Sequence, residues 1–370
     1  MSRVIDRRML DLATRAAWRG MGLVEPNPMV GCVIASPSGD VLGVGHHRSF
    51  GGPHAEVEAL RACVANGNEP RGATAYVTLE PCNHHGKTGP CSHALIEASI
   101  ARVVYAEPDP GPASRGGAAH LAAHGVAVEH ASWHVAGSDA SASFRKRIES
   151  GLPWIIAKWA QTLDGRAATR TGASQWISNA WSRAAVHRLR SRMDVVLTGI
   201  GTVLADDPML TARRTCVRSV ARRVVVDALL QTPTDSRLLR SARDVPVTIV
   251  TRREQAESRQ AASLRSLGAE VVAPGDAGAA RVDLEASLRW LAAAHDATNV
   301  LVEAGPGLLG SMLHLVDRAV VYIAPTVFGD ADALAAVSGQ VTAELQDGTR
   351  WSLGRVRRLG DDLEVTYRRT

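Results

Sequence analysis

A break at Gly151 and Pro153 divides this 370-residue chain into two blocks, and that division constrains its fold more than any other feature. A helical segment with the basic cluster from Phe144 to Gly151 ends there, because glycine and proline both interrupt helices. One hydrophobic core rarely extends beyond about 250 to 300 residues, so two domains are expected. We predict the first over residues 1–150 and the second over residues 151–370.

Strand-like and helical segments alternate in the first block, after an amphipathic opening helix. Two apolar runs within residues 29–47 flank a turn of Pro, Ser, Gly and Asp, which is typical of a β-hairpin. The pattern then predicts a helix from His54 to Ala65, a buried strand from Ala73 to Glu80, a helix from His93 to Ser99 and a strand over residues 101–108. The first domain is therefore predicted to be α/β.

The second block continues this alternation with a new set of apolar segments. Strands are predicted over residues 154–160, 194–200, 222–228, 245–251, 269–274, 299–305 and 319–325, and helices over residues 179–192 and 286–295. Strands that alternate with helices are typical of parallel sheets. We therefore expect a second α/β domain with a largely parallel sheet.

Composition and cysteine content predict a folded, water-soluble protein of the cytoplasm. Apolar residues make up 45% of the chain and charged residues 21%, which is ordinary for a globular protein. Charges interrupt the apolar runs near the N-terminus, and no apolar run reaches the roughly 18 residues of a membrane span, so neither a signal peptide nor a membrane partner is expected. The 5 cysteines are few and odd in number, which favours free thiols in a reducing compartment.

The charge distribution gives little support to a nucleic-acid partner. The formal net charge is +5, but 37 acidic residues are scattered among 42 basic ones and no long basic block occurs. A small phosphorylated substrate explains this balance as well as nucleic acid does. We expect a small-molecule substrate and no nucleic acid.

The strongest chemical signal is a set of metal-binding residue types, His54, Cys82 and Cys91. One imidazole and two thiolates suit zinc, and three protein ligands favour a catalytic site because a structural zinc usually has four. Bound zinc lowers the pKa of a water ligand to roughly 7. Glu56 follows His54 by two residues on one predicted helix and so does not share its face; we expect it beside that water as the proton carrier.

This pattern is typical of zinc-dependent nucleobase deaminases, in which a His-x-Glu segment precedes a Pro-Cys segment. Cys82 is expected to begin a helix, where amide dipoles favour a thiolate. Two alternatives remain open: a structural zinc module, or buried cysteines beside an incidental histidine. Other possible ligands are His46, His47, His84 and His85, for which solvent-facing or substrate-contacting positions are favoured because the three-ligand set is complete.

The spacing of the cysteines points to one family. Eight residues separate Cys82 from Cys91, whereas nucleic-acid deaminases usually place two between their cysteines. Together with residues 26–34, this loop resembles the bifunctional riboflavin-biosynthesis deaminase/reductase family called RibD. Three further segments, residues 158–178, 202–213 and 302–311, are similar to its reductase motifs. The resemblance implies a cytidine-deaminase-like three-layer domain followed by a dihydrofolate-reductase-like α/β domain.

The resemblance also implies two reactions. In the family, the first domain hydrolyses the ring amine of 2,5-diamino-6-(5-phosphoribosylamino)pyrimidin-4-one. The second uses NADPH to reduce the ribosyl group, giving 5-amino-6-(5-phosphoribitylamino)uracil. Zinc and NADPH are therefore the implied cofactors, a small phosphorylated pyrimidine is the implied substrate, and a homodimer or homotetramer is the implied assembly.

Site residues follow by motif position. His54, Cys82 and Cys91 are implied to hold zinc, Glu56 to transfer protons and Asn27 to contact the pyrimidine. The residues implied to lie along NADPH are Ala160, Trp176, Thr202, Asp206, Gly305, Pro306, Gly307, Leu308, Leu309, Gly310 and Ser311. Those implied to face the reductase substrate are Ser174, Arg190, Leu210, Arg213 and Glu303.

Part of the second set has a physical rationale of its own. The glycine-rich run from Gly305 to Ser311 follows an apolar strand and precedes a helical segment, where backbone amides can face phosphate, although a simple helix start explains it equally well. No acidic residue stands about 20 positions further on to bind a ribose hydroxyl, which leaves room for NADP and for a fold other than the Rossmann type. Arg190 and Arg213 are predicted to bind the substrate phosphate.

The chain departs from the family pattern at a few positions. Glu58 stands where the family commonly has histidine, Glu107 to Pro110 reads EPDP rather than DPNP, and Ala228 replaces a usual serine. Two other functions stay open on the sequence: a tRNA or nucleic-acid deaminase with an accessory domain, and a zinc-stabilised protein without catalysis. The long loop between the cysteines and the lack of a basic, aromatic-interleaved groove count against the nucleic-acid deaminase.

Overall fold

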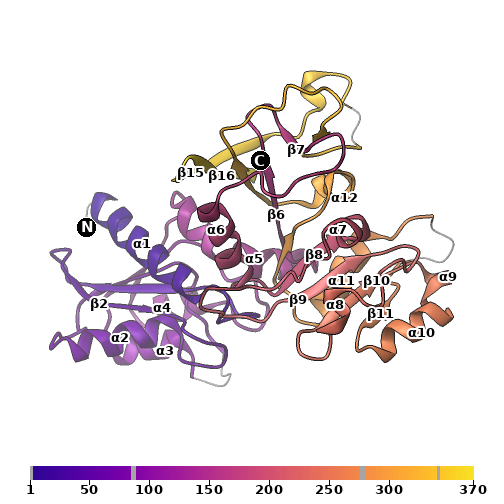
Figure 1. Cartoon of the computed structure of the whole chain (residues 1–370). Helices are drawn as coiled ribbons and strands as arrows, with labels where there is room; N and C mark the ends of the chain where they lie inside the picture. The colour runs from indigo at the N-terminus through magenta and orange to yellow at the C-terminus, as the bar shows by residue number, and fades with distance from the viewer. Residues whose placement is uncertain (1–2, 85–88, 276–279, 340–341) are drawn as a thin grey trace. The chain divides into compact units, whose positions relative to one another are not determined.

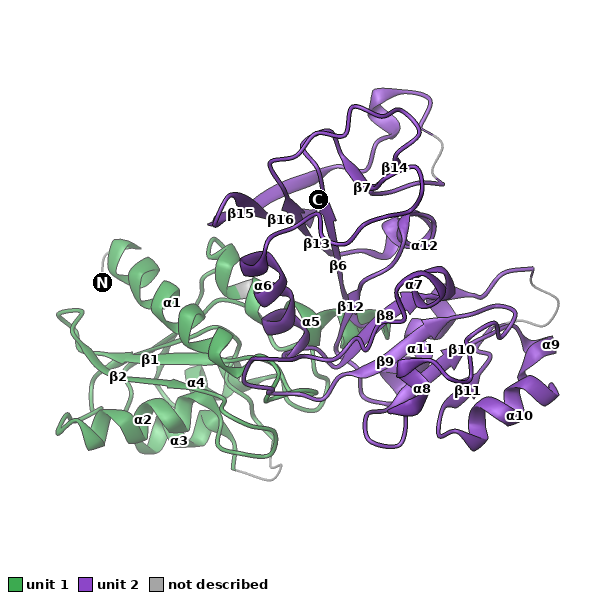
Figure 2. Ribbon diagram, viewed as in Figure 1, with its two compact units in different colours: residues 1–152 green, residues 153–370 purple. Residues whose placement is uncertain are grey.

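The chain forms two compact units, residues 1–152 and 153–370 (Figure 2). The structure is a computed structural model that describes residues 3–84, 89–275, 280–339 and 342–370. The last helix of unit 1, α5 (Val135–Ser150), ends at Gly151, whose φ of 70° is left-handed. Each unit contains its own main sheet.

Unit 1 is built on a five-stranded sheet in the order β2-β1-β3-β4-β5. The strands are β1 (Gly31–Ala35), β2 (Val41–His46), β3 (Thr74–Val77), β4 (Arg102–Tyr105) and β5 (Ala127–His130); the other helices are α1 (Arg3–Ala17), η1 (Trp18–Gly20), α2 (Ala55–Ala65), α3 (Cys91–Glu97) and α4 (Gly117–Ala123). β1 is antiparallel to β2 and β3, whereas β3, β4 and β5 are parallel. The predicted hairpin and α/β character are confirmed.

Helices cover both faces of this sheet because β1 alternates its buried side chains between two cores. Cys32 and Ile34 pack with residues of α2, α3 and α4. Val33 and Ala35 point the other way, into a core that includes Met9 of α1. Figure 1 shows α1 on one side of the sheet and α2 and α3 on the other. The expected three-layer arrangement is confirmed.

Glycine at position 45 sets the distance between α2 and the sheet. A Cβ at Gly45 would lie 2.2 Å from the backbone nitrogen of Ala59 and 2.4 Å from the carbonyl oxygen of Ala55. No side chain fits there, so α2 packs directly against β2. The start of α2, which follows His54, is thereby fixed against the sheet.

Unit 2 contains a nine-stranded sheet in the order β11-β10-β9-β8-β12-β6-β13-β16-β15 and a two-stranded sheet of β14 and β7. The strands are β6 (Trp154–Gln161), β7 (Arg166–Ala168), β8 (Val195–Gly199), β9 (Arg222–Val226), β10 (Val247–Val250), β11 (Glu270–Val272), β12 (Asn299–Val302), β13 (Arg318–Ile323), β14 (Leu334–Ala335), β15 (Trp351–Leu359) and β16 (Asp362–Arg369). All seven predicted strands of this block are present and parallel, so the expected largely parallel sheet is confirmed.

The helices of unit 2 are α6 (Ala180–Arg190), α7 (Ile200–Asp206), α8 (Arg237–Arg240), α9 (Arg253–Ala256), α10 (Arg259–Ser266), α11 (Leu284–Ala294) and α12 (Pro306–Met312), with short 3-10 turns η2 (Leu313–Leu315) and η3 (Leu345–Asp347). The C-terminal hairpin of β15 and β16 was not predicted; β16 is antiparallel both to β13 and to β15. Among the described residues, no helix is long and apolar enough to span a membrane.

The strand order of unit 2 places a ligand-binding edge at its centre. The chain enters at β6, moves outward through β8 to β11, and then returns with β12 between β8 and β6. In parallel sheets, ligands bind at the carboxyl ends of the strands where the order reverses. The segments that follow β8 and β12 are therefore the first place to look for a site.

Candidate active sites

Three predicted metal ligands of unit 1 converge. The ligand atoms of His54, Cys82 and Cys91 all lie within 4.8 Å of one another, and no other such group is present in the described part of the chain. The Nδ1 atom of His54 lies 3.4 Å from Cys82 Sγ and 3.3 Å from Cys91 Sγ. One imidazole and two sulfurs at this separation fit a tetrahedral zinc site with one position left for another ligand.

The local structure around these ligands differs from the sequence expectation at one point. His54 is the N-cap of α2, and Cys91 is the first residue of α3, directly after Pro90. Cys82 was predicted to begin a helix, and that prediction is wrong: it lies in an irregular segment between β3 and α3. The helix dipole still acts on it, because the backbone amide of Cys91 donates to Cys82 Sγ at 3.5 Å.

The electrostatics of this cluster favour a metal-binding thiolate. Hydrogen bonds from Cys91 and His54 lower the pKa of Cys82 well below its ordinary value. Burial, together with the negative charge of Cys82, raises the pKa of Glu56 to about 7. Glu56 is 3% exposed and lies on the first turn of α2, outside the ligand group. It is therefore a buried carboxyl group next to the cluster, as expected for a proton carrier.

Asn27 and the additional histidines have distinct surroundings. The Asn27 side-chain nitrogen lies 3.2 Å from His47 Nε2, and His47 Nδ1 lies 2.9 Å from the carbonyl oxygen of Pro53. The His47 ring meets the His54 ring edge-on, with centroids 5.4 Å apart. Asn27 is thus linked through His47 to the neighbourhood of the metal cluster. His46 and His84 are half-buried, and His85 lies outside the described residues.

A carboxylate that the sequence analysis did not single out organises the next layer of unit 1. Glu80 accepts hydrogen bonds from the backbone amides of Gly116, at 3.1 Å, Ala118, at 3.0 Å, and Asp109, at 3.2 Å. It stands two residues before Cys82, so it connects the metal-ligand segment to the start of α4. Such a role depends on long-range contacts and leaves no local signal in the sequence.

The acidic departures from the family pattern are mostly neutralised. Glu58 forms ion pairs with Arg48, at 2.7 Å, and Arg61, at 3.2 Å. Glu107 forms an ion pair with Arg145. Asp109 is buried, which raises its pKa, and its side chain accepts a hydrogen bond from the amide of Gly111 at 2.8 Å.

In unit 2, Glu303 follows β12 directly and forms the centre of a buried charge cluster. Arg190, the last residue of α6, donates from Nε at 2.5 Å and from a terminal nitrogen at 2.9 Å. Lys158 of β6 places Nζ 3.7 Å from Glu303. Burial by itself would raise the pKa of Glu303, but the charge and hydrogen bonds of Arg190, aided by Lys158, hold it at about 2. Glu303 is therefore ionised at neutral pH.

Acidification tests this cluster. Because the folded-state pKa of Glu303 is depressed to about 2, its stabilisation is fully present above the unfolded value near 4.3 and is lost as the pH falls from there through about 2. We expect calorimetry to show that the stability difference between the wild-type chain and Glu303→Gln shrinks across this window. A stability difference that stays constant down to about pH 2, where Glu303 becomes protonated in the folded state, would contradict an ionised Glu303.

The two arginines predicted to bind phosphate differ in whether their guanidinium groups are free to do so. The two nitrogens of Arg190 that could bind phosphate side by side are occupied by Glu303, and a third donates to the carbonyl oxygen of Thr211 at 3.3 Å. Arg213 is exposed as a whole residue, but partial desolvation of its guanidinium and the charges of Arg190 and Arg237 lower its pKa. Positive charge thus accumulates around Arg213, which suits a phosphate.

Two unpredicted residues shape this site. Lys158 is a lone lysine in an apolar strand, a signal that the sequence offered. Arg223 of β9 is fully buried and donates to the carbonyl oxygens of Met209, Ser241 and Val245. It holds the segment that carries Leu210, whose side chain is buried although its φ is 52°. A left-handed non-glycine residue persists only where its surroundings fix it.

Several predicted cofactor residues of unit 2 lie close together. Gln175 donates to Asp206 at 3.0 Å, which joins the segment containing Ser174 and Trp176 to the end of α7. Trp176 is 68% exposed, and the guanidinium carbon of Arg183 stacks over its ring, 4.7 Å from the ring centroid. A Cβ at Gly305, the N-cap of α12, would lie 3.8 Å from Oγ1 of Thr202. Ala160 lies on β6, paired with Tyr322 of β13.

The glycines of the run from Gly305 to Ser311 serve different purposes. A Cβ at Gly310 would lie 1.8 Å from the carbonyl oxygen of Ser338, so this glycine is required by packing. A Cβ at Gly307, which is exposed, would have no other atom within 4 Å. The open side of the run is therefore its beginning, next to Thr202. Pro306, Leu308, Leu309 and Ser311 complete the segment within α12.

Comparisons with known proteins cover both units. Residues 3–107 match the cytidine and deoxycytidylate deaminase zinc-binding region, and residues 153–365 match the RibD C-terminal domain. The chain is 37% identical to the riboflavin biosynthesis protein RibD of Escherichia coli over 371 residues, covering 97% of this chain and 98% of that protein. It is 35% identical to RibD of Aquifex aeolicus over the full length of both. A diaminohydroxyphosphoribosylaminopyrimidine deaminase/5-amino-6-(5-phosphoribosylamino)uracil reductase from Thermotoga maritima, of known structure, is 31% identical, with a TM-score of 0.83 and 99% of each chain covered.

Proposed function

Because the chain belongs to the RibD family, we propose that it performs two successive steps on one phosphorylated pyrimidine. Unit 1 hydrolyses the ring amine of 2,5-diamino-6-(5-phosphoribosylamino)pyrimidin-4-one. Unit 2 reduces the ribosyl group of the product to ribityl, giving 5-amino-6-(5-phosphoribitylamino)uracil. The chain is thus a deaminase and a reductase of riboflavin biosynthesis. The observation that carries this proposal is the convergence of one imidazole and two sulfurs beside buried Glu56.

In unit 1 we assign zinc binding to His54, Cys82 and Cys91. Zinc, when bound, supplies Lewis acidity for the hydrolysis. Glu56 accepts and returns a proton, a role supported by its burial and by its pKa of about 7, close to the working pH. Asn27, linked to His47, orients the pyrimidine.

In unit 2 we assign the central charge cluster to the ribosyl end of the substrate. NADPH, when bound, supplies the hydride. Glu303, fixed by Arg190 and Lys158, orients the sugar, and Arg213 binds the phosphate. Leu210 and Ser174 complete the substrate side. The residues proposed to hold NADPH are Ala160, Trp176, Thr202, Asp206 and the run from Gly305 to Ser311.

Product masses test both assignments. The purified chain is incubated with the phosphoribosylated diaminopyrimidinone, with and without NADPH. Deamination replaces an amino group with an oxygen, and reduction adds two hydrogens, so each product has its own mass. We expect the deaminated product in both samples and the reduced product only with NADPH. Absence of any deaminated product from zinc-loaded protein would refute the first assignment.

Removal of zinc is expected to separate the two activities. A chelator that strips the metal should abolish deamination, while reduction of the already deaminated pyrimidine continues, because the zinc cluster belongs to unit 1. The metal content of the treated protein is measured alongside both rates, and added zinc should restore deamination. Deamination by protein shown to be free of metal would contradict the ligand assignment.

We also propose a cytoplasmic location, a small-molecule substrate rather than nucleic acid, and a homodimer or homotetramer. The free cysteines of the described chain support a reducing compartment. The assembly rests on family membership alone. Light scattering of the purified chain measures it directly.

A further inference from the structure

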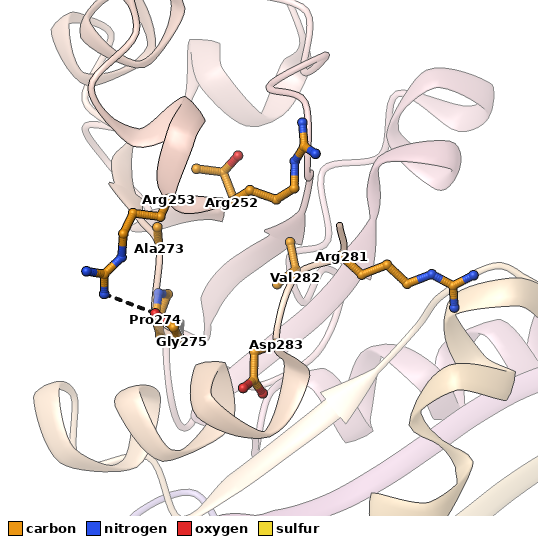
Figure 3. Close-up of a pocket in the computed structure, with 9 residues that line it drawn as sticks. Arg252, Arg253, Ala273, Pro274, Gly275, Arg281, Val282 and Asp283 are labelled. Carbon is orange, nitrogen blue, oxygen red and sulfur yellow. Dashed lines mark hydrogen bonds between the residues drawn. The ribbon is translucent and has the colours of Figure 1, made fainter. Parts of the chain in front are cut away.

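A basic pocket lies at the carboxyl ends of β10 and β11, and none of its lining residues was singled out in the sequence (Figure 3). Arg252, Arg253 and Arg281 line it with Asp283 as the acidic member. Asp283 is the N-cap of α11 and accepts a hydrogen bond from the amide of Ala286 at 2.9 Å, so its carboxylate is engaged by the helix. The lining therefore has an excess of positive charge.

The arginines of this pocket are not equivalent. Arg253 donates to the carbonyl oxygen of Gly275 at 3.0 Å, and Figure 3 shows it extending to one side, whereas Arg252 and Arg281 extend to the other side in different directions. Arg252 donates from Nε to the carbonyl oxygen of Ala228 at 3.2 Å. Within the described residues, its terminal nitrogens and the guanidinium of Arg281 have neither a hydrogen bond nor an ion pair. Arg252, which is half-buried, thus has terminal nitrogens left to bind an anion, while the exposed Arg281 adds positive charge to the pocket.

Backbone structure fixes the position of Arg252. It follows Thr251, which is buried and donates to the same carbonyl oxygen of Ala228 at 3.2 Å. A neutral carbonyl oxygen orients the guanidinium without cancelling its charge. A guanidinium held this way presents two N–H groups in the fork geometry that matches phosphate oxygens.

The pocket shares an edge of the sheet with the proposed cofactor residues. The strand order β11-β10-β9-β8-β12 puts β10 two strands from β8, which Thr202 follows, and three from β12, which the run from Gly305 follows. Neighbouring strands are about 4.8 Å apart, so the pocket lies roughly 10 to 15 Å along this edge. An extended dinucleotide whose diphosphate lies at the start of α12 crosses that distance with its adenosine end.

We propose that Arg252 binds the 2′-phosphate of NADPH and thereby selects it over NADH. This inference rests on the proposed function of unit 2 and names the part of the chain that recognises the cofactor's phosphate. An arginine near the adenosine ribose is the usual means of accommodating this additional phosphate.

A binding experiment tests the proposal without turnover. The full chain is titrated with 2′,5′-ADP and with 5′-AMP by calorimetry. We expect the wild-type protein to bind 2′,5′-ADP about tenfold to 100-fold more tightly than 5′-AMP. Charge-assisted hydrogen bonds to one phosphate provide affinity of this size. Arg252→Met should remove most of this preference and Arg252→Lys should keep part of it. The control is Arg259→Met, which removes the same charge from the exposed first residue of α10.

Kinetics separate this proposal from the one on which it rests. In Arg252→Met we expect the KM for NADPH to rise by about tenfold or more, with kcat and the KM for NADH unchanged. Unchanged turnover with NADH verifies that unit 2 of the variant is folded. If the wild-type chain reduces the substrate with NADPH but binds 2′,5′-ADP and 5′-AMP equally well, the proposed 2′-phosphate subsite is wrong. The reductase assignment would then stay intact. No reduction with either cofactor would overturn the reductase assignment, while the titration still decides whether the pocket binds a 2′-phosphate.

Discussion

A Glu56→Gln variant is expected to deaminate about 100- to 10,000-fold more slowly than the wild-type chain, which is the usual contribution of a positioned proton carrier. Glutamine keeps the size and most of the polarity of Glu56 but cannot take up a proton. Because Glu56 is not a member of the ligand group, zinc content should not change. The measurement is the deamination rate at saturating substrate, with metal analysis of the same sample.

Two controls isolate the effect. Reduction of the deaminated pyrimidine by the same preparation should proceed at the wild-type rate, because that site belongs to unit 2. Glu58→Gln should retain deamination, since Glu58 is paired with Arg48 and Arg61 and lies on the same helix. If Glu56→Gln deaminates at the wild-type rate with a normal zinc content, a group other than Glu56 must transfer the proton.

Residue chemistry and spacing predicted the metal site well, because its ligands are of rare and specific types. The two cysteines and the histidine were identifiable without knowing how the loop between them folds. The local structure of Cys82 was not predictable in the same way. Proline before a cysteine suggested a helix start at Pro81, but the chain offers a second Pro-Cys pair at Pro90, and the helix begins there. The local pattern did locate that helix, predicted from His93 to Ser99, but it did not show that Cys82 lies outside a helix.

The fold of the sheets was predictable where apolar runs are continuous. The parallel strands of unit 2 are buried on both faces and therefore stand out as apolar segments, as in Val195–Gly199. The C-terminal hairpin was missed because β15 is largely exposed and its apolar residues are interrupted by serine, glycine and arginine. A strand of this kind is defined by its pairing with β16, which is a long-range property.

Groups that act through tertiary contacts were the least predictable. Glu80 binds three backbone amides from segments far along the chain, and Arg223 binds three carbonyl oxygens. Arg252 became distinguishable from other surface arginines only once the strand order placed it on the cofactor edge. Sequence alone gives such residues the appearance of ordinary charged positions.

Replacement of Glu303 by glutamine is expected to reduce the rate of the reductase by about 100-fold or more, the effect of a displacement of reacting groups by roughly 1 Å. Glutamine removes the negative charge that pairs with both Arg190 and Lys158, and the two buried cations then repel each other. An uncompensated buried charge of this kind costs about 3 to 5 kcal/mol, so the sugar-orienting geometry is lost. NADPH oxidation with the deaminated pyrimidine measures the effect, and deamination by the same protein verifies folding of unit 1.

Glu285→Gln is the matched control. The exposed ion pair of Glu285 with Arg289 contributes at most about 0.5 kcal/mol, so the reductase rate of this variant should equal that of the wild type. Equal rates for Glu303→Gln and Glu285→Gln would show that the charge cluster stabilises the unit without orienting the substrate.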